Sequence, residues 1–284
     1  MITVIITTYN RPAHLRLALE AISRQFTQPD EVIIADDGSG EETDKIIQAF
    51  ALESGMTIAH VWQEHKGFRA AKSRNNALHI ANGDFIAFID QDGLAHQTWL
   101  EKHLELHKPG KVNIGGLIML DEQSSSQMTN EKILLGEFEK MHPDEEENRI
   151  NRLQRKSNFY SFMRRMRIGI KNKPRLDSGN FAISKIDIEK VNGFDENYTG
   201  WGQEDDDIGR RLYLAGIMPN PVINSARVTH LWHKRDASAP QKWAQGGNVE
   251  YFTRKYIESY CRNGINKPGN ITREPVVVKR YNFD

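Results

Sequence analysis

Short apolar runs alternate with amphipathic segments over the first third of the chain. The apolar runs are rich in β-branched side chains and predict strands; they cover residues 3–8, 31–35, 56–62 and 84–89. Apolar positions at helical spacing, with Pro12 well placed as a first helical residue, predict helices between them over residues 12–25, 42–54 and 69–82. Because strands and helices alternate over short connections, the sequence predicts an α/β fold. We expect a doubly wound sheet with helices on both faces, in a single large domain.

The strand predicted over residues 84–89 ends in two carboxylates, Asp90 and Asp92. In open α/β sheets, ligands bind at the carboxyl ends of the strands. Neighbouring carboxylates repel each other unless a cation neutralises them, and hard oxygen ligands suit Mg²⁺ or Mn²⁺ bridging a diphosphate. The alternative is a plain turn, since the segment Asp-Gln-Asp-Gly is also favourable turn chemistry.

Polar side chains also follow the other predicted strands and open the third helix. Such a converging set suits a nucleotide, and arginines at a helix N-terminus suit its diphosphate. The alternative for the arginines is an exposed basic helix face. No glycine-rich dinucleotide or Walker phosphate loop follows the first strand. The candidate nucleotide-binding residues are Thr8, Tyr9, Arg11, Asp36, Asp37, Arg69, Arg74 and Asp90.

The overall composition restricts the partners and the compartment. The chain has 38 basic and 38 acidic residues, so its net charge gives no general attraction to nucleic acid. Its single cysteine, Cys261, fits a reducing compartment. We find neither a signal-peptide pattern nor an apolar stretch long enough to span a bilayer. We therefore expect a cytoplasmic protein, at most peripheral on the inner face of the plasma membrane.

Taken together, four segments resemble the large family 2 of inverting glycosyltransferases, which have a GT-A fold with a mixed sheet. The segments are residues 4–11, 35–39, 71–75 and 90–92, within a donor half of roughly residues 1–107. The resemblance implies a UDP-sugar donor and a divalent cation, Mn²⁺ or Mg²⁺. It also implies that Thr8, Arg11 and Asp37 line the uracil and ribose. Asp90 would meet the ribose or a metal-bound water, and Asp92 would bind the metal.

Residues 108–176 form a variable basic insertion. Four acidic residues at positions 144–147 are followed by a stretch, 148–176, that contains no acidic residue and interleaves cations with aromatic residues and methionines. Such a stretch predicts an interfacial segment on an anionic membrane or a groove for an anionic acceptor. The alternative is a solvated insertion whose cations pair with the preceding acids.

A second chemical cluster begins at Gly200 and ends in four consecutive carboxylates, residues 204–207. Apolar residues follow at helical spacing, so the carboxylates lie at a helix N-terminus, and the alternative is a plain acidic cap. The segment is similar to the Trp-Gly-x-Glu-Asp-Asp-Asp motif of animal β-galactosyltransferases and bacterial chondroitin polymerases. That resemblance implies a catalytic base with a second acid beside it, and an acceptor site. In this sequence Asp205 corresponds to the base and Glu204 to the second acid. The acceptor site corresponds to Trp201, Gly202 and Asp206.

Two histidines, His230 and His233, lie near the end of a strand predicted over residues 222–229. Both are candidates for the remaining metal ligand, with a slight preference for His230. Their odd spacing would direct them to opposite faces if the strand continued. Further along, we expect a terminal helix over residues 241–260 and a loose basic tail beyond Asn263.

These observations predict an acceptor-binding and catalytic half over residues 177–262 and a C-terminal tail over 263–284. The predicted activity is inverting transfer of galactose, N-acetylgalactosamine or N-acetylglucosamine from a UDP-sugar. The expected acceptor is a saccharide or lipid-linked saccharide, in bacterial surface polysaccharide or lipopolysaccharide synthesis. A sugar nucleotidyltransferase and a non-catalytic sugar- or membrane-binding protein of the same fold are the alternatives.

Overall fold

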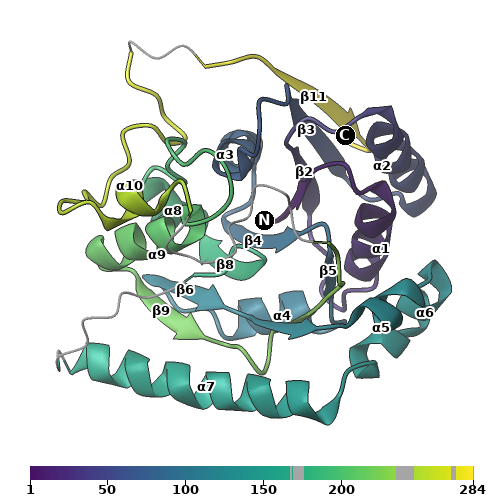
Figure 1. The fold of residues 1–284 in the computed structure, drawn as a ribbon. Helices are drawn as coiled ribbons and strands as arrows, with labels where there is room; N and C mark the ends of the chain where they lie inside the picture. The colour runs from purple at the N-terminus through teal and green to yellow at the C-terminus, as the bar shows by residue number, and fades with distance from the viewer. Residues whose placement is uncertain (167, 169–175, 235–245, 270–272, 284) are drawn as a thin grey trace.

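A computed structural model describes residues 1–166, 168, 176–234, 246–269 and 273–283 of the chain. Its main sheet has eight strands in the order β11-β3-β2-β1-β4-β8-β6-β9 (Figure 1). Strands β3, β2, β1 and β4 run parallel, whereas β11 and β8 pair antiparallel with them, so the sheet is mixed. The strands are β1 Ile2–Thr8, β2 Glu31–Asp36, β3 Ile58–Gln63, β4 Phe85–Asp90, β6 Lys111–Ile114, β8 Asn180–Ser184, β9 Met218–Pro221 and β11 Val276–Tyr281.

Helices cover both faces of this sheet, as the sequence predicts (Figure 1). Alternate residues of β1 point to opposite faces: Val4 and Ile6 pack in the cluster with α1 and α2, and Ile5 packs in the cluster with α3 and α9. The predicted alternation of the first four strands with three helices is thereby confirmed. The helices that pack on the sheet are α1 Pro12–Ser23, α2 Glu41–Ser54, α3 Ala70–Ile80, α4 Trp99–Glu105, α8 Lys185–Lys190 and α9 Glu204–Leu214.

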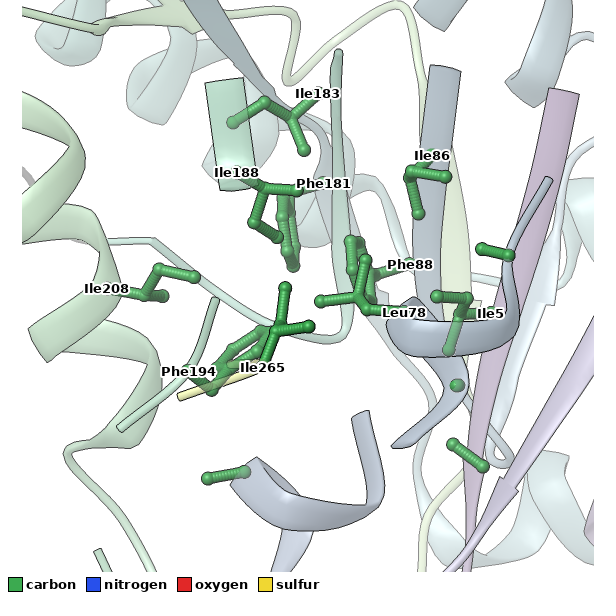
Figure 2. Packing of buried hydrophobic residues seen from close by; sticks show 14 of the residues in the cluster. Ile5, Leu78, Ile86, Phe88, Phe181, Ile183, Ile188, Phe194, Ile208 and Ile265 are labelled. Carbon is green, nitrogen blue, oxygen red and sulfur yellow. The ribbon is translucent and has the colours of Figure 1, made fainter. Parts of the chain in front are cut away.

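The core between β4, β8 and the segment before α9 is aromatic (Figure 2). The rings of Phe88 on β4 and Phe181 on β8 are stacked with their centroids 4.3 Å apart, and Phe194 meets Phe88 edge-on at 5.8 Å. All three side chains are fully buried, and burial of each contributes about 1.5–3 kcal/mol. This packing fixes β8 and the segment leading to α9 against β4.

A second sheet of three strands, in the order β5-β10-β7, lies beside the end of β4. It comprises β5 Gly93–Ala95, β10 Arg227–His230 and β7 Gly116–Met119. A Cβ atom at Gly116 would lie 2.1 Å from the carbonyl oxygen of Ile223, so only glycine allows this close approach. The strand predicted over 222–229 is therefore wrong in its first half, because only Arg227–His230 enters the sheet. This sheet brings the segment after β4 against the end of β10.

The C-terminal segment differs most from expectation. The only helix among the described residues 246–260 is α10 Val249–Thr253, so the predicted long terminal helix is wrong there; residues 241–245 lie outside the described residues. The expected loose tail is also wrong, because β11 pairs antiparallel with β3 from Val276 opposite Gln63 to Tyr281 opposite Ile58. The remaining helices are α5 Glu122–Ser126, α6 Asn130–Leu135, the 3₁₀ helix η1 Glu137–Lys140 and α7 Asp144–Arg165. Among the helices described, none is long and apolar enough to cross a membrane.

Candidate active site

The loops at the carboxyl ends of β1 and β4 are connected by Gln91, the central residue of the Asp-x-Asp motif formed by residues 90–92. The hydroxyl of Thr8 donates to Gln91 Oε1 at 2.5 Å, and the backbone N–H of Tyr9 donates to the same oxygen at 3.1 Å. Gln91 Nε2 in turn donates to the carbonyl of Tyr9 at 3.2 Å. Sequence analysis assigned Gln91 no role, although its position between two candidate site residues is a signal for one.

Asp36 and Asp37, at the end of β2, have different surroundings. Asp36 is bonded within its own turn, accepting from the backbone N–H of Ser39 at 2.8 Å, and lies 2.8 Å from His60 Nε2. Asp37 accepts from Gln63 Nε2 and from the backbone N–H of Arg69, both at 2.6 Å. Burial of Asp37 raises the pKa of its carboxyl group. Asp36 therefore shapes the loop, while Asp37 connects it to the start of α3.

The ring of Tyr9 stacks on the imidazole of His65, with their centroids 4.4 Å apart and their planes 10° from parallel. The Nδ1 atom of His65 lies 3.1 Å from the carbonyl of Asp37, so this stack borders the candidate nucleotide site. Arg69, expected at the diphosphate, points its guanidinium toward the C-terminal segment and donates to Glu274 at 2.9 Å. Lys72 also donates to Glu274. Sequence analysis did not identify His65 or Glu274.

Asp92, His230 and His233 form a cluster, here called the metal corner, whose ligand atoms lie within 4.8 Å of one another. His230 Nε2 lies 3.4 Å from Asp92 Oδ1, and His233 Nε2 lies 3.0 Å from Asp92 Oδ2. The two histidines do not point to opposite faces, because β10 ends at His230 and both imidazoles approach Asp92. The backbone N–H of Leu231 donates to the carbonyl of Asp92 at 2.8 Å and holds the two segments in register.

The donor set of the metal corner fits a divalent cation. The buried atoms Asp92 Oδ1 and His230 Nδ1 have no hydrogen-bond partner within the described part of the chain. His233 Nδ1 lies 3.0 Å from the carbonyl of Lys234; if Nδ1 carries the proton, Nε2 is left as the ligand atom. Arg11 Nη1 donates to Asp92 Oδ2 at 3.1 Å, which leaves Oδ1 for the cation. The mixed oxygen and nitrogen set favours Mn²⁺ over Mg²⁺, whose sites are built mainly of oxygen.

Asp92 is surrounded by positive charge. Its burial acts to raise the pKa of the carboxyl group, but the hydrogen bond from His233 and the charges of His230 and Arg11 outweigh burial and lower that pKa. The hydrogen bond to Asp92 likewise raises the pKa of His233. The carboxylate is therefore ionised over the whole physiological pH range.

Arg74 on α3 links the two halves of the site. Its buried guanidinium donates to Asp90 at 3.0 Å through Nη2, to Glu204 at 3.2 Å through Nη1, and to Thr7 at 3.0 Å through Nε. Arg74 and Glu204 are 3% and 6% exposed, so both are desolvated and depend on each other's charge. Although the arginine was expected at the diphosphate, its place is between the Asp-x-Asp motif and the first residue of α9.

The start of α9 carries the second set of carboxylates, here called the base corner: Glu204, Asp205 and Asp206. The chain enters α9 through Gln203, which has a left-handed φ of 73°, and this turn directs successive carboxylates to different sides of the helix. Asp205 and Asp206 line a cavity of about 340 Å³, to which Asp177 also contributes. Asp177 opens the segment before β8, and sequence analysis gave it no role.

Asp205 has the opposite electrostatic surroundings to Asp92. Burial is the main cause that raises the pKa of its carboxyl group well above the ordinary value, and the neighbouring charges of Glu204, Asp177 and Asp206 add to this effect. Such a carboxyl group binds a proton more readily than an exposed one, which suits a general base.

The loop that carries Trp201 is held from the C-terminal segment. Asn248 Nδ2 donates to the carbonyl of Gly202 at 2.8 Å and to that of Gly200 at 3.4 Å. Both glycines have positive φ, 79° at Gly200 and 94° at Gly202, which favours glycine at these positions. The indole of Trp201 is half-buried directly before α9. Asn248 thus links residues far apart in sequence, which explains why sequence analysis missed it.

Residues 3–176 match the model of the family described as Glycosyl transferase family 2, which is more than half of the 284 residues. The chain belongs to this family. Residues 159–234, which include the base corner and both His230 and His233, also match a model described as the N-terminal domain of galactosyltransferase. The predicted resemblance, with its galactosyltransferase-like second motif, is confirmed.

Other family members are similar over most of this chain. Validoxylamine A glucosyltransferase from Streptomyces hygroscopicus subsp. limoneus is 31% identical over 76% of this chain and 49% of its own length. The hyaluronan synthase of Pasteurella multocida is 30% identical over 76% of this chain and 23% of its own length. The chondroitin synthase of Escherichia coli is 29% identical over 76% of this chain and 32% of its own length. The chain thus spans half or less of the length of these relatives.

The fold of this family 2 chain is of the GT-A type. A mannosyltransferase from Pyrobaculum calidifontis, solved in complex with GDP-Man and Mn²⁺, superposes with a TM-score of 0.56 at 18% identity over 82% of this chain and 57% of that one. The Staphylococcus aureus protein TarS superposes with a TM-score of 0.53 at 15% identity over 81% of this chain and 36% of that one. The predicted mixed α/β fold is confirmed.

Proposed function

We propose that this protein is a metal-dependent inverting glycosyltransferase that uses a UDP-sugar donor. The observation that supports this most is a continuous link between the two corners: Arg74 binds Asp90, two residues before the metal ligand Asp92, and Glu204, directly before Asp205. The link keeps a cation-binding carboxylate and a proton-accepting carboxylate at one edge of the sheet. An inverting transfer needs such a pair, because the base acts on the face opposite the leaving group.

The residues of the chain divide the reaction between them. Thr8, Arg11 and Asp37 line the uracil and ribose, and Asp90 lies next to the ribose. Asp205 accepts the proton of the attacking acceptor hydroxyl, and the acceptor sugar stacks on Trp201 with Asp206 beside its hydroxyl groups. Asp92, His230 and His233 hold Mn²⁺, which when bound stabilises the developing charge of the leaving diphosphate.

The transferred sugar is galactose, N-acetylgalactosamine or N-acetylglucosamine, and the acceptor is a saccharide or lipid-linked saccharide of a bacterial surface polysaccharide or lipopolysaccharide. Two observations support this choice. The segment containing the base corner matches a galactosyltransferase model. Among the similar proteins are synthases named for chondroitin and hyaluronan.

Turnover of a panel of UDP-sugars in the presence of Mn²⁺ tests this function. The panel contains the three UDP-sugars above and UDP-glucose, because one similar protein is named a glucosyltransferase. Release of UDP identifies the donor, and proton NMR of the product with added saccharide acceptors gives its anomeric configuration. We expect one preferred donor and a β-linked product from its α-linked sugar. An α-linked product would contradict the inverting mechanism, and failure to consume any UDP-sugar would contradict the choice of donor.

A further inference from the structure

The outer face of α7 carries an exposed apolar stripe. Phe159, Phe162 and Met166 are 57%, 58% and 54% exposed, and their spacing of three and four residues places them on one side of the helical axis. Towards the N-terminus, Arg155 and Arg152 continue the same stripe and are exposed. Figure 1 shows α7 along one edge of the molecule, on the side opposite β11. Adjacent exposed aromatic side chains on a helix indicate a binding surface.

In the described part of the chain, four exposed cations of α7 have no acidic partner. Of the acids in the first turn of α7, Glu146 binds Arg149 at 2.7 Å, and Glu147 binds Arg227 on β10, with a shortest distance of 2.7 Å. Within the described residues, no acid forms an ion pair with the exposed residues Arg152, Arg155, Lys156 or Arg165. The alternative that the cations of the insertion pair with the preceding acids therefore holds for Arg149 and not for the outer face.

A basic helix with exposed phenylalanines has the composition of a segment that lies in the headgroup region of an anionic bilayer. Each cation there gains from the negative surface, and the phenylalanine rings reach the acyl boundary. Docking of this face on a second copy of the chain would bring the same cations opposite one another, which opposes such an interface. We propose that the outer face of α7 binds an anionic phospholipid surface.

The inner side of the same helix faces the acceptor cavity. Ile150 and Gln154 of α7 are buried against the body of the protein. Arg149 and Leu153 line the cavity of about 340 Å³ that also contains Asp205. One helix therefore contacts the lipid on one side and forms a wall of the acceptor cavity on the other. If the proposed function holds, this arrangement delivers a lipid-anchored saccharide to Asp205.

Co-sedimentation with vesicles tests the surface directly. The vesicles are phosphatidylcholine alone, or phosphatidylcholine mixed with phosphatidylglycerol, at low and high salt. We expect binding only to the mixed vesicles, with affinity falling as salt rises. The variant Arg152→Gln/Arg155→Gln is expected to lose about fivefold in partition for each arginine. Phe159→Ser/Phe162→Ser is expected to weaken binding at both salt concentrations, because it removes the apolar contribution.

Matched control substitutions lie on other faces. Leu52 on α2 is 71% exposed, and the side chain of Arg262 is 80% exposed, so Leu52→Ser and Arg262→Gln change similar chemistry elsewhere. Both should bind vesicles like the wild type. Thermal unfolding of each variant must match the wild type, which shows that lost binding is not lost folding.

The outcomes separate this proposal from the proposed function. Turnover of the UDP-sugar without vesicles should be unchanged in all four variants. No binding of the wild type to mixed vesicles at low salt, or equal binding by the α7 variants, would overturn the membrane surface even if turnover is intact. A change of sedimentation coefficient in the phenylalanine variant without vesicle binding would assign the face to a second copy instead. If vesicles bind but no UDP-sugar is consumed, the membrane surface stands and the proposed function fails.

Discussion

Asp92 and Asp205 are carboxylates at the same edge of the sheet, yet their surroundings are opposite. Asp92 lies 3.1 Å from Arg11 and 3.0 Å from His233, and these positive neighbours lower the pKa of its carboxyl group despite burial. Asp205 lies among Glu204, Asp177 and Asp206, and burial together with these negative neighbours raises the pKa of its carboxyl group. The carboxylate of Asp92 therefore stays ionised, whereas that of Asp205 binds a proton more readily than an exposed carboxylate does.

In the proposed mechanism this difference gives two tasks to one residue type. An ionised carboxylate is needed to hold a cation, whereas a base must bind a proton during the reaction and release it afterwards. Arg74 links the two corners, since its guanidinium pairs with Asp90 on one side and with Glu204 on the other.

The largest effect is expected from Asp205→Asn, which removes the base and leaves the metal corner intact. The kcat should fall by about 10²–10⁴-fold, the usual contribution of a general base, while the Kd for UDP should stay unchanged. Steady-state kinetics and calorimetry measure the two quantities. Asp144→Asn, at an exposed site at the start of α7, is the matched control and should retain activity. Full activity of the Asp205 variant would rule out its role as base.

Arg74→Gln tests the link between the corners. It leaves Asp90 and Glu204 without their cation, and breaking a buried ion pair in this way costs roughly 3–5 kcal/mol of unfolding free energy. Arg16→Gln is the control, because Arg16 pairs with Glu20 and Glu53 nearer the surface. This substitution should cost at most about 1 kcal/mol of unfolding free energy. Urea denaturation of both variants measures the difference. Equal losses of unfolding free energy in the two variants would mean that the ion pairs of Arg74 contribute no more to stability than surface pairs do.

His233→Ala disturbs the metal corner alone. Removing an imidazole from the site should weaken Mn²⁺ binding by at least about 10–100-fold, the loss typical of even indirect supports of a metal site. Electron paramagnetic resonance of free Mn²⁺ gives the affinity, and His79→Ala, at an exposed position on α3, is the control. If Mn²⁺ affinity is unchanged, the cation is held elsewhere.

The smallest effect is a shift in the pH profile. Because the pKa of Asp205 is raised, the base is protonated and inactive below that pKa, so kcat/KM should fall with decreasing pH well above the ordinary carboxyl value of about 3.9. Glu204→Gln removes a charge that contributes to the shift, and should move the acid limb to lower pH. If kcat/KM of the wild type falls only near the ordinary carboxyl pKa, Asp205 is not the group whose protonation stops the reaction.

The sequence was sufficient where structure depends on local pattern. The strands and helices of residues 2–90 follow from apolar spacing, and the site residues at strand ends follow from the topology. The sequence did not predict structure that depends on contacts between residues far apart in the chain. Val276–Tyr281 pairs with β3 more than two hundred residues earlier, so a strand-like sequence was interpreted as a loose tail.

The candidate site shows the same division. The positions of Asp90, Asp92 and Asp205 were predictable, whereas the directions of Arg69 and Arg74 were not, because Glu274 and Glu204 come from other parts of the chain. The geometry of His230 and His233 depends on where β10 ends, which no apolar pattern marks. Gln91, Asp177 and Asn248 act through hydrogen bonds or cavity walls that only the folded chain creates.

The most direct test of the proposed function is calorimetric titration of UDP into the protein, with and without Mn²⁺. The metal corner and the nucleotide loops act together in our account, so UDP should bind measurably only when Mn²⁺ is present. UDP binding that is equally tight without any divalent cation would contradict the role of Asp92, His230 and His233. An absence of UDP binding under every metal condition would contradict the donor site itself.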